Sequence, residues 1–143
     1  MIQIAVSDIE PAPQGSKTYY GNGRLVEASQ RVKPWRMTVE IEVRREMRKQ
    51  NYAMIKGPCH VMLEFRFNRP KNHYTTNKQL TAAAPLHYIV KKNDIDKCCR
   101  STLDALTGTI IKDDSLVISM HAEKRYCMAE EASGALITVV PLA

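Results

Sequence analysis

Residues 59–67 read CHVMLEFRF, and this stretch decides the fold because its apolar and polar side chains alternate. Successive side chains of a β-strand point to opposite faces of a sheet, so strict alternation predicts a strand that is buried on one side. The set expected to face the core is Cys59, Val61, Leu63, Phe65 and Phe67. The set expected on the other face is His60, Met62, Glu64 and Arg66.

A strand, a hairpin and a helix are predicted upstream of this stretch. Residues 1–6 alternate and predict a short strand. Residues 19–26 predict a hairpin, because the Gly-Asn-Gly sequence at its centre tolerates positive φ. A helix should begin at Pro34, since proline suits the first helical position. Its apolar face recurs every four residues and comprises Trp35, Val39, Val43 and Met47. Its other face is basic, which ordinary solvation explains more simply than a DNA contact, and comprises Arg44, Arg45, Arg48 and Lys49.

A second helix and three strands are predicted downstream. Asn93 or Asp94 can cap this helix, and Gly108 is suitably placed to stop it. Its expected buried face comprises Ile95, Cys98, Cys99, Thr102, Ala105 and Leu106. The expected strands are residues 86–90, 116–121 and 136–140. With 143 residues, the chain predicts a single α+β domain, with a mixed or mostly antiparallel sheet and two main helices.

Composition narrows the class of protein. Lys and Arg outnumber Asp and Glu by 21 to 15, and the resulting net charge of +6 favours a polyanionic partner such as nucleic acid. The four cysteines form no C-x-x-C pair, so no zinc site is expected. A disulfide framework is not expected either, because the sequence shows no export signal. The first residues lack an export signal, and no apolar run approaches the ~20 residues that span a bilayer. We therefore expect a reduced, cytoplasmic protein without a membrane partner.

A long basic segment follows the strand at 59–67. Residues 68–85 contain almost no apolar side chain before Leu80, and loops of this length are usually functional or disordered. Cations beside an aromatic ring suit a DNA backbone, although an isolated loop histidine such as His73 is often only a surface residue. The candidate DNA-binding residues here and just beyond are Arg69, Lys71, His73, Lys78, Lys91 and Lys92.

Four carboxylates surround the second predicted helix. Asp94 and Asp96 stand at its start, and Asp113 and Asp114 follow its end. Hydrolysis of a phosphodiester needs charge neutralisation and an activated water, and magnesium held by carboxylates supplies both. The alternative interpretation is structural, because aspartates are common at helix starts and in turns without any metal. A D-x-D motif alone does not decide between the two.

Helical spacing assigns roles within this group. Arg100 lies four residues after Asp96, so the two share one helix face, and Arg100 could stabilise charge on a phosphate. Asp104 lies eight residues after Asp96, which is roughly 12 Å along a helix. We therefore expect a structural hydrogen bond or an exposed charge at Asp104 rather than a metal ligand.

The order of these residues resembles a known signature. Residues 93–108 read NDIDKCCRSTLDALTG, and residues 113–117 read DDSLV. A D-x-D that opens a helix, a basic residue four positions later, D-A-L, a short connection, D-D and a strand resemble the RusA family of Holliday junction resolvases. The resemblance is strong over residues 90–125 and looser upstream, at residues 69–71 and 84–85.

The resemblance implies a homodimeric endodeoxyribonuclease that resolves four-way DNA junctions by paired symmetric cuts in recombination and repair. It implies that magnesium, for which manganese can substitute, is bound by Asp94, Asp96 and Asp114, with Asp113 as the reserve candidate. Arg100 matches a catalytic basic position where lysine is familiar, and the two are not equivalent. Lys124 matches another basic position and is expected to contact DNA. Members of this family are common in phages.

Two departures from the family pattern leave these candidate ligands in place: Asn93 stands where proline is common, and Lys97 where asparagine is common. No small-molecule substrate is expected. One alternative is a less selective nuclease for branched DNA. A second is a catalytically silent module that binds junctions, against which the acidic residues argue because they would weaken DNA binding. A third is a structural protein with well-capped helices.

Overall fold

A computed structural model describes residues 1–15, 17–19, 25–27 and 30–143. Its main sheet has four strands in the order β1-β6-β4-β5. Their bounds are β1 Ile2–Ser7, β4 Cys59–Phe67, β5 Val117–Tyr126 and β6 Gly134–Pro141. The β1–β6 and β6–β4 pairs are antiparallel, whereas β4 and β5 run parallel. The sheet is therefore mixed, as the sequence predicts.

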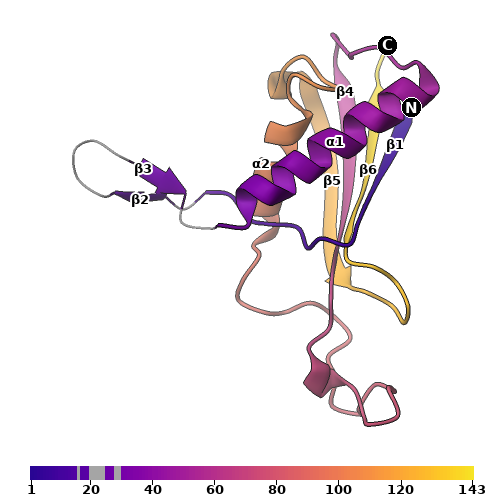
Figure 1. Cartoon of the computed structure of the whole chain (residues 1–143). Helices are drawn as coiled ribbons and strands as arrows, with labels where there is room; N and C mark the ends of the chain where they lie inside the picture. The colour runs from indigo at the N-terminus through magenta and orange to yellow at the C-terminus, as the bar shows by residue number, and fades with distance from the viewer. Residues whose placement is uncertain (16, 20–24, 28–29) are drawn as a thin grey trace.

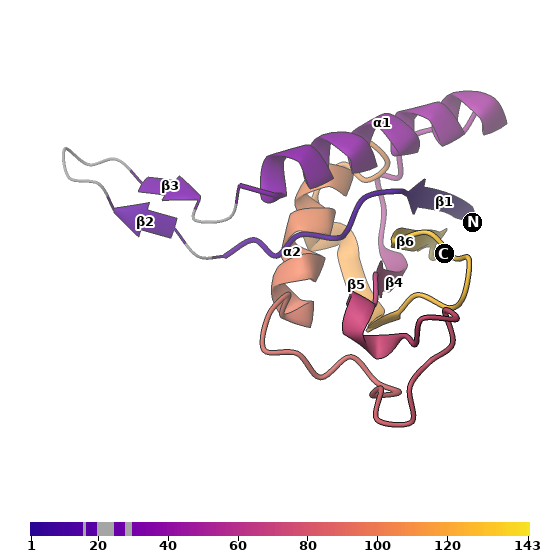
Figure 2. The same cartoon turned by 60° about the horizontal axis from the view of Figure 1, so that its bottom comes forward.

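Both long helices cover the same face of this sheet, as Figures 1 and 2 show. These helices are α1 (Val32–Gln50) and α2 (Ile95–Leu106). The predicted alternation of β4 is confirmed, because its five odd-numbered residues are buried and form part of the core. The chain is thus a single α+β domain with one helical layer on one sheet, and its core lies between the two layers.

Helix α1 buries the predicted apolar stripe. Trp35, Val39 and Val43 are buried, and Met47 is half-buried against the core. The Trp35 indole also donates a hydrogen bond of 3.2 Å to Thr102 Oγ1 of α2, which joins the two helices. The helix begins two residues before the predicted Pro34, which lies in its first turn.

Helix α2 buries five of the six residues predicted for its inner face, and Ile95 is half-buried. It ends at Leu106, and Gly108 then adopts a φ of 79° in the left-handed region that glycine favours. Asp94 occupies the N-cap position without a side-chain capping bond. The buried Asn93 does not cap the helix either, because its amide donates to the Tyr88 hydroxyl at 2.8 Å. The predicted capping bond is therefore wrong.

The predicted hairpin is present as two short strands outside the main sheet (Figure 1). Strands β2 (Lys17–Tyr19) and β3 (Leu25–Glu27) pair antiparallel with each other. The predicted turn at residues 21–23 lies outside the described residues.

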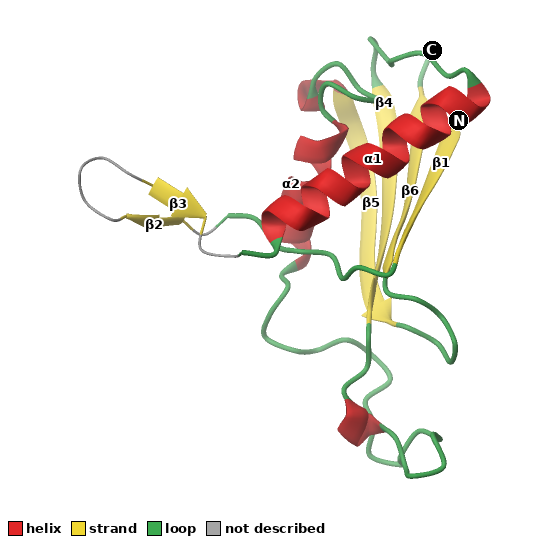
Figure 3. Ribbon diagram, in the orientation of Figure 1, coloured by secondary structure: helices red, strands yellow, loops and turns green. Residues whose placement is uncertain are grey.

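The predicted strand at residues 86–90 is wrong. Figure 3 shows that the chain between β4 and α2 is a long loop, interrupted only by a short 3-10 turn at Lys71–His73. Within residues 86–90 only Tyr88 is buried, whereas Leu86 and Ile89 are each 77% exposed. A run of five residues that buries one side chain removes little apolar surface from water, so burial contributes little free energy toward forming a strand there.

The other two downstream strands are confirmed, but both are longer than predicted. Strand β5 continues to Tyr126, and β6 begins at Gly134. The described part of the chain contains no helix that is both long and apolar enough to cross a membrane.

Candidate functional site

A cavity of about 520 Å³ lies beside α2 and β5 and gathers Asp96, Arg100 and Asp114, three of the four predicted catalytic residues. Asp96, Arg100 and Asp104 line it from α2, and Asp114 lines it from the short 3-10 turn that precedes β5. The apolar residues that complete its lining are Ile95, Cys99, Leu103, Met120 and Ala122. Three carboxylates and one guanidinium thus share a cavity that is open to solvent.

The spacing of α2 explains why three of these groups come together. Residues 96, 100 and 104 are four apart, so they form one row along the exposed side of the helix. Asp96 and Arg100 are both exposed, and Asp104 is half-buried. The sequence analysis predicted this shared face for Asp96 and Arg100.

Asp104 is held by the N-terminal segment. Gln14 Nε2 donates a hydrogen bond of 2.5 Å to Asp104 Oδ2, and the backbone N–H of Gln14 donates to Lys97 O at 3.0 Å. Two residues earlier, Ala12 O accepts a hydrogen bond of 2.6 Å from the buried Ser101 hydroxyl. The segment before β2 is therefore fastened along α2, and it fixes one carboxylate of the cavity.

The structural hydrogen bond predicted for Asp104 is present, but this residue also lines the cavity. Gln14 lies 90 residues before Asp104, and no sequence pattern marks it as part of the site. No spacing rule connects two residues that only the tertiary fold brings together. The buried Gln14 Oε1 has no hydrogen-bond partner in the described structure.

The two adjacent aspartates at the end of the connection have different surroundings. Asp113 Oδ1 accepts a hydrogen bond of 2.8 Å from the backbone N–H of Ser115 and so caps the 3-10 turn. Hydrogen bonds from Ser115 lower the pKa of Asp113 below its ordinary value. Asp114, in contrast, lines the cavity. Of the two candidates for a third ligand, Asp114 is the one on the cavity wall.

Asp94 lies outside this cavity. It is exposed, and its Oδ2 forms an ion pair of 3.5 Å with Lys97 Nζ one helical turn away. Among the described residues, no cluster of three or more His, Cys, Asp or Glu side chains could hold a metal ion. Asp96 and Asp114 do supply the oxygen donors that Mg²⁺ prefers, and this ion often binds through one or two carboxylates together with substrate phosphates. Asp96 and Asp114 are therefore the carboxylates of the cavity whose chemistry suits magnesium.

The cysteine beside the cavity does not supply a nucleophile. Burial raises the pKa of Cys99 to about 11 and that of its neighbour Cys98 to about 12. Because the thiolate is the reactive form, both thiols are inert at neutral pH. The prediction that they are small core residues is confirmed by their burial.

The predicted DNA-binding cations fall into two groups. Three of them contact the protein itself: the Arg69 guanidinium lies 4.5 Å from the Tyr126 ring centre, His73 packs edge-on against the same ring, and Lys124 Nζ donates to Asn93 O at 3.2 Å. The exposed group comprises Lys71, Lys78, Lys91 and Lys92. The four exposed lysines lie on the long loop between β4 and α2, whereas Lys124 lies on β5.

Comparison with known proteins gives one family match. The family model described as endodeoxyribonuclease RusA matches residues 8–138 of the 143-residue chain. The match covers the N-terminal segment that carries Gln14, both long helices and the whole cavity. No curated protein matches the chain significantly.

Proposed function

The chain belongs to the RusA endodeoxyribonuclease family, and from that premise we propose that it is a magnesium-dependent endonuclease that resolves four-way DNA junctions by paired cuts. The observation that carries the proposal is the cavity beside α2 and β5, where Asp96, Arg100 and Asp114 lie together. The net charge of +6 suits a polyanionic substrate.

The chemistry of the charged side chains suggests a role for each of them. Asp96 and Asp114 would hold magnesium, and Asp94, which is paired with Lys97, is the further candidate ligand at the start of α2. Magnesium, when bound, neutralises phosphate charge and makes water a better nucleophile at neutral pH. Arg100 donates hydrogen bonds to the phosphate and stabilises the charge that develops on it during cleavage.

Asp104 acts as a positioning residue in this proposal. Gln14 occupies one of its carboxylate oxygens, and the cavity lining places Asp104 one helical turn after Arg100. Its charge would attract the Arg100 guanidinium, because oppositely charged side chains four residues apart are neighbours on a helix. The planar fork of arginine suits bidentate contact with a phosphate.

Paired cuts require two active sites, so we propose that the functional unit is a homodimer. Each copy supplies one cavity, and the two copies cut strands of like polarity across the junction. The exposed lysines of the long loop, Lys71, Lys78, Lys91 and Lys92, would bind backbone phosphates. Binding should therefore weaken steeply with salt.

Cleavage of a labelled four-way junction, beside a linear duplex of the same sequence, tests the proposal. The expected result is a pair of symmetric nicks in the junction alone, with magnesium or manganese and not with EDTA. Equal cutting of flaps and forks would instead indicate a less selective nuclease for branched DNA. Tight junction binding without cutting would replace it with a silent binding module. A protein that neither binds nor cuts would refute the DNA-directed function.

A further inference from the structure

A second cavity, which we call the loop pocket, lies between the long loop and the end of β5. Its volume is about 700 Å³, and its lining includes Tyr74, Leu80 and Leu86 from the loop together with Tyr126 and Met128. Three of these apolar side chains are unusually exposed: Leu80 at 52%, Leu86 at 77% and Met128 at 70%. Large apolar side chains that gather around a concave surface mark a binding site more often than isolated ones do.

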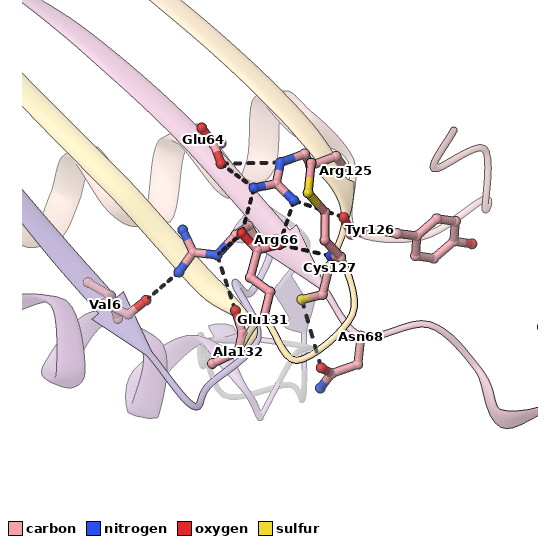
Figure 4. Close-up of polar contacts among 10 residues, drawn as sticks. Val6, Glu64, Arg66, Asn68, Arg125, Tyr126, Cys127, Glu131 and Ala132 are labelled. Carbon is pink, nitrogen blue, oxygen red and sulfur yellow. Dashed lines mark hydrogen bonds and ion pairs between the residues drawn. The ribbon is translucent and has the colours of Figure 1, made fainter. Parts of the chain in front are cut away.

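Basic side chains border this apolar surface. Arg69, Lys78, His87 and Arg125 also line the loop pocket, and within the described residues no Asp or Glu lines it. Arg125 is fixed in place, because Glu131 and Glu64 both accept hydrogen bonds from its guanidinium (Figure 4). Arg69 is fixed by its hydrogen bond of 2.7 Å to Pro85 O. Because Glu64 and Glu131 balance the charge of Arg125, Arg69 and Lys78 supply the positive charge of the rim. Tyr126 is buried, so the accessible aromatic wall is the half-buried Tyr74, beside the exposed Leu80, Leu86 and Met128.

These features select the class of ligand. An aliphatic peptide would contact the apolar walls but would leave the basic side chains unused. A duplex backbone would contact the basic side chains but would leave the apolar walls unused. An unpaired nucleotide uses both, because its base stacks on aromatic and apolar side chains while its phosphate meets the rim. The neighbouring cavity of about 500 Å³ shares Tyr74, Lys78 and Ala129 with the loop pocket and adds Lys71, Thr75 and Glu130. A strand leaving the loop pocket thus meets another lysine and one carboxylate.

The loop pocket also lies within reach of the proposed active site. Strand β5 serves both places, since Ala122 lines the carboxylate cavity and Tyr126 lines the loop pocket. Four residues of strand separate the two by about 13 Å. A stacked DNA strand covers that distance in roughly four nucleotides. Between them, Lys124 lies over the Tyr88 ring, and Tyr88 packs against Tyr126 with ring centres 4.9 Å apart.

We propose that the loop pocket accepts an unpaired nucleobase of the DNA strand, about four nucleotides from the phosphate that is cut. This inference rests on the proposed function for the position of the base, but base binding itself does not require cleavage. Bases at a branch point cost less to extrude than bases inside a duplex, so such a pocket favours branched over linear DNA. The long loop then binds unpaired bases in its pocket, in addition to the backbone phosphates that its lysines would bind.

Two binding measurements with the full chain test the inference separately from cleavage. The first uses a short single-stranded oligonucleotide that carries fluorescent 2-aminopurine. The second uses four-way junctions that carry 2-aminopurine at successive positions from one to six nucleotides beside the cut, bound by Asp96→Asn. The variants are Met128→Ser in the loop pocket and Met37→Ser on α1, where the methionine is 51% exposed and lines neither cavity.

The expected result is a fluorescence change at junction positions near four nucleotides, together with oligonucleotide binding that Met128→Ser weakens at least fivefold and Met37→Ser does not. Equal effects of the two substitutions, or none, would overturn the inference whether or not the wild type cuts junctions. A Met128→Ser effect confined to self-association in sedimentation would also overturn it, in favour of a contact between copies. Oligonucleotide binding that depends on Met128, in a protein that cuts no junction, would support the pocket and refute only the proposed resolvase.

Discussion

The substitution Glu131→Gln tests how the turn between β5 and β6 is held against the sheet. Figure 4 shows Arg125 between two carboxylates, and its two terminal nitrogens donate to the two oxygens of Glu131 at 2.6 and 2.8 Å. Glu131 also accepts the backbone N–H of Met128 at 2.9 Å. These hydrogen bonds, those from Arg125 first, lower the pKa of Glu131 from 4.5 to about 2.

The size of the effect follows from this shift in pKa. One pKa unit corresponds to about 1.4 kcal/mol, so the shift sets a ceiling of about 3 kcal/mol on the contribution of the ionised form. The Glu131 side chain is 30% exposed, and solvent screening lowers the expected value to about 1–2 kcal/mol. Because the folded pKa is depressed, this stability is fully present above pH 4.5 and is lost as the pH falls toward 2.

Urea unfolding of wild type and Glu131→Gln at pH 7, 5, 4 and 3 measures the effect. We expect the variant to be less stable by about 1–2 kcal/mol at pH 7 and pH 5, and the difference to shrink below pH 4.5. Glu130→Gln, at the adjacent exposed position, is the matched control and should change stability by less than about 0.5 kcal/mol. A difference between wild type and Glu131→Gln that stays constant from pH 7 to pH 3 would refute the reasoning.

Two further substitutions test the contacts between α2 and its neighbours. Trp35→Phe removes the buried hydrogen bond to Thr102 and leaves a small void, so we expect urea unfolding to show a loss of about 2 kcal/mol; a loss below about 0.5 kcal/mol would contradict the packing described. Gln14→Ala frees Asp104 without removing a charge, so junction cleavage should slow about tenfold while the thermal midpoint changes little. A cleavage rate equal to that of the wild type would show that Asp104 needs no anchor.

Local periodicity of apolar residues was sufficient to predict much of the fold. The alternation of β4 and the four-residue repeat of Trp35, Val39 and Val43 are confirmed, because each pattern fixes which side of its element is buried. The same reasoning failed at residues 86–90, where an apolar run lies on the surface and only Tyr88 reaches the core. Apolar content alone does not reveal whether a strand has a neighbour to pair with.

The candidate site divides in the same way. Helical spacing placed Asp96 and Arg100 on one face. Residue spacing did not separate Asp113 from Asp114, and only the family resemblance favoured Asp114. Their difference depends on the 3-10 turn, which directs one carboxylate to a backbone N–H and the other to the cavity. The role of Gln14 could not be predicted for a related reason, since its contact with α2 exists only in the folded chain.

The pair Asp113→Asn and Asp114→Asn provides the most direct test of the claim that the cavity beside α2 and β5 is the active site. The two substitutions make the same chemical change at neighbouring positions, but only Asp114 lines the cavity. Single-turnover cleavage of a labelled four-way junction should fall at least a hundredfold for Asp114→Asn and less than about fivefold for Asp113→Asn. Equal rates for Asp114→Asn and wild type, or a large loss confined to Asp113→Asn, would contradict the account.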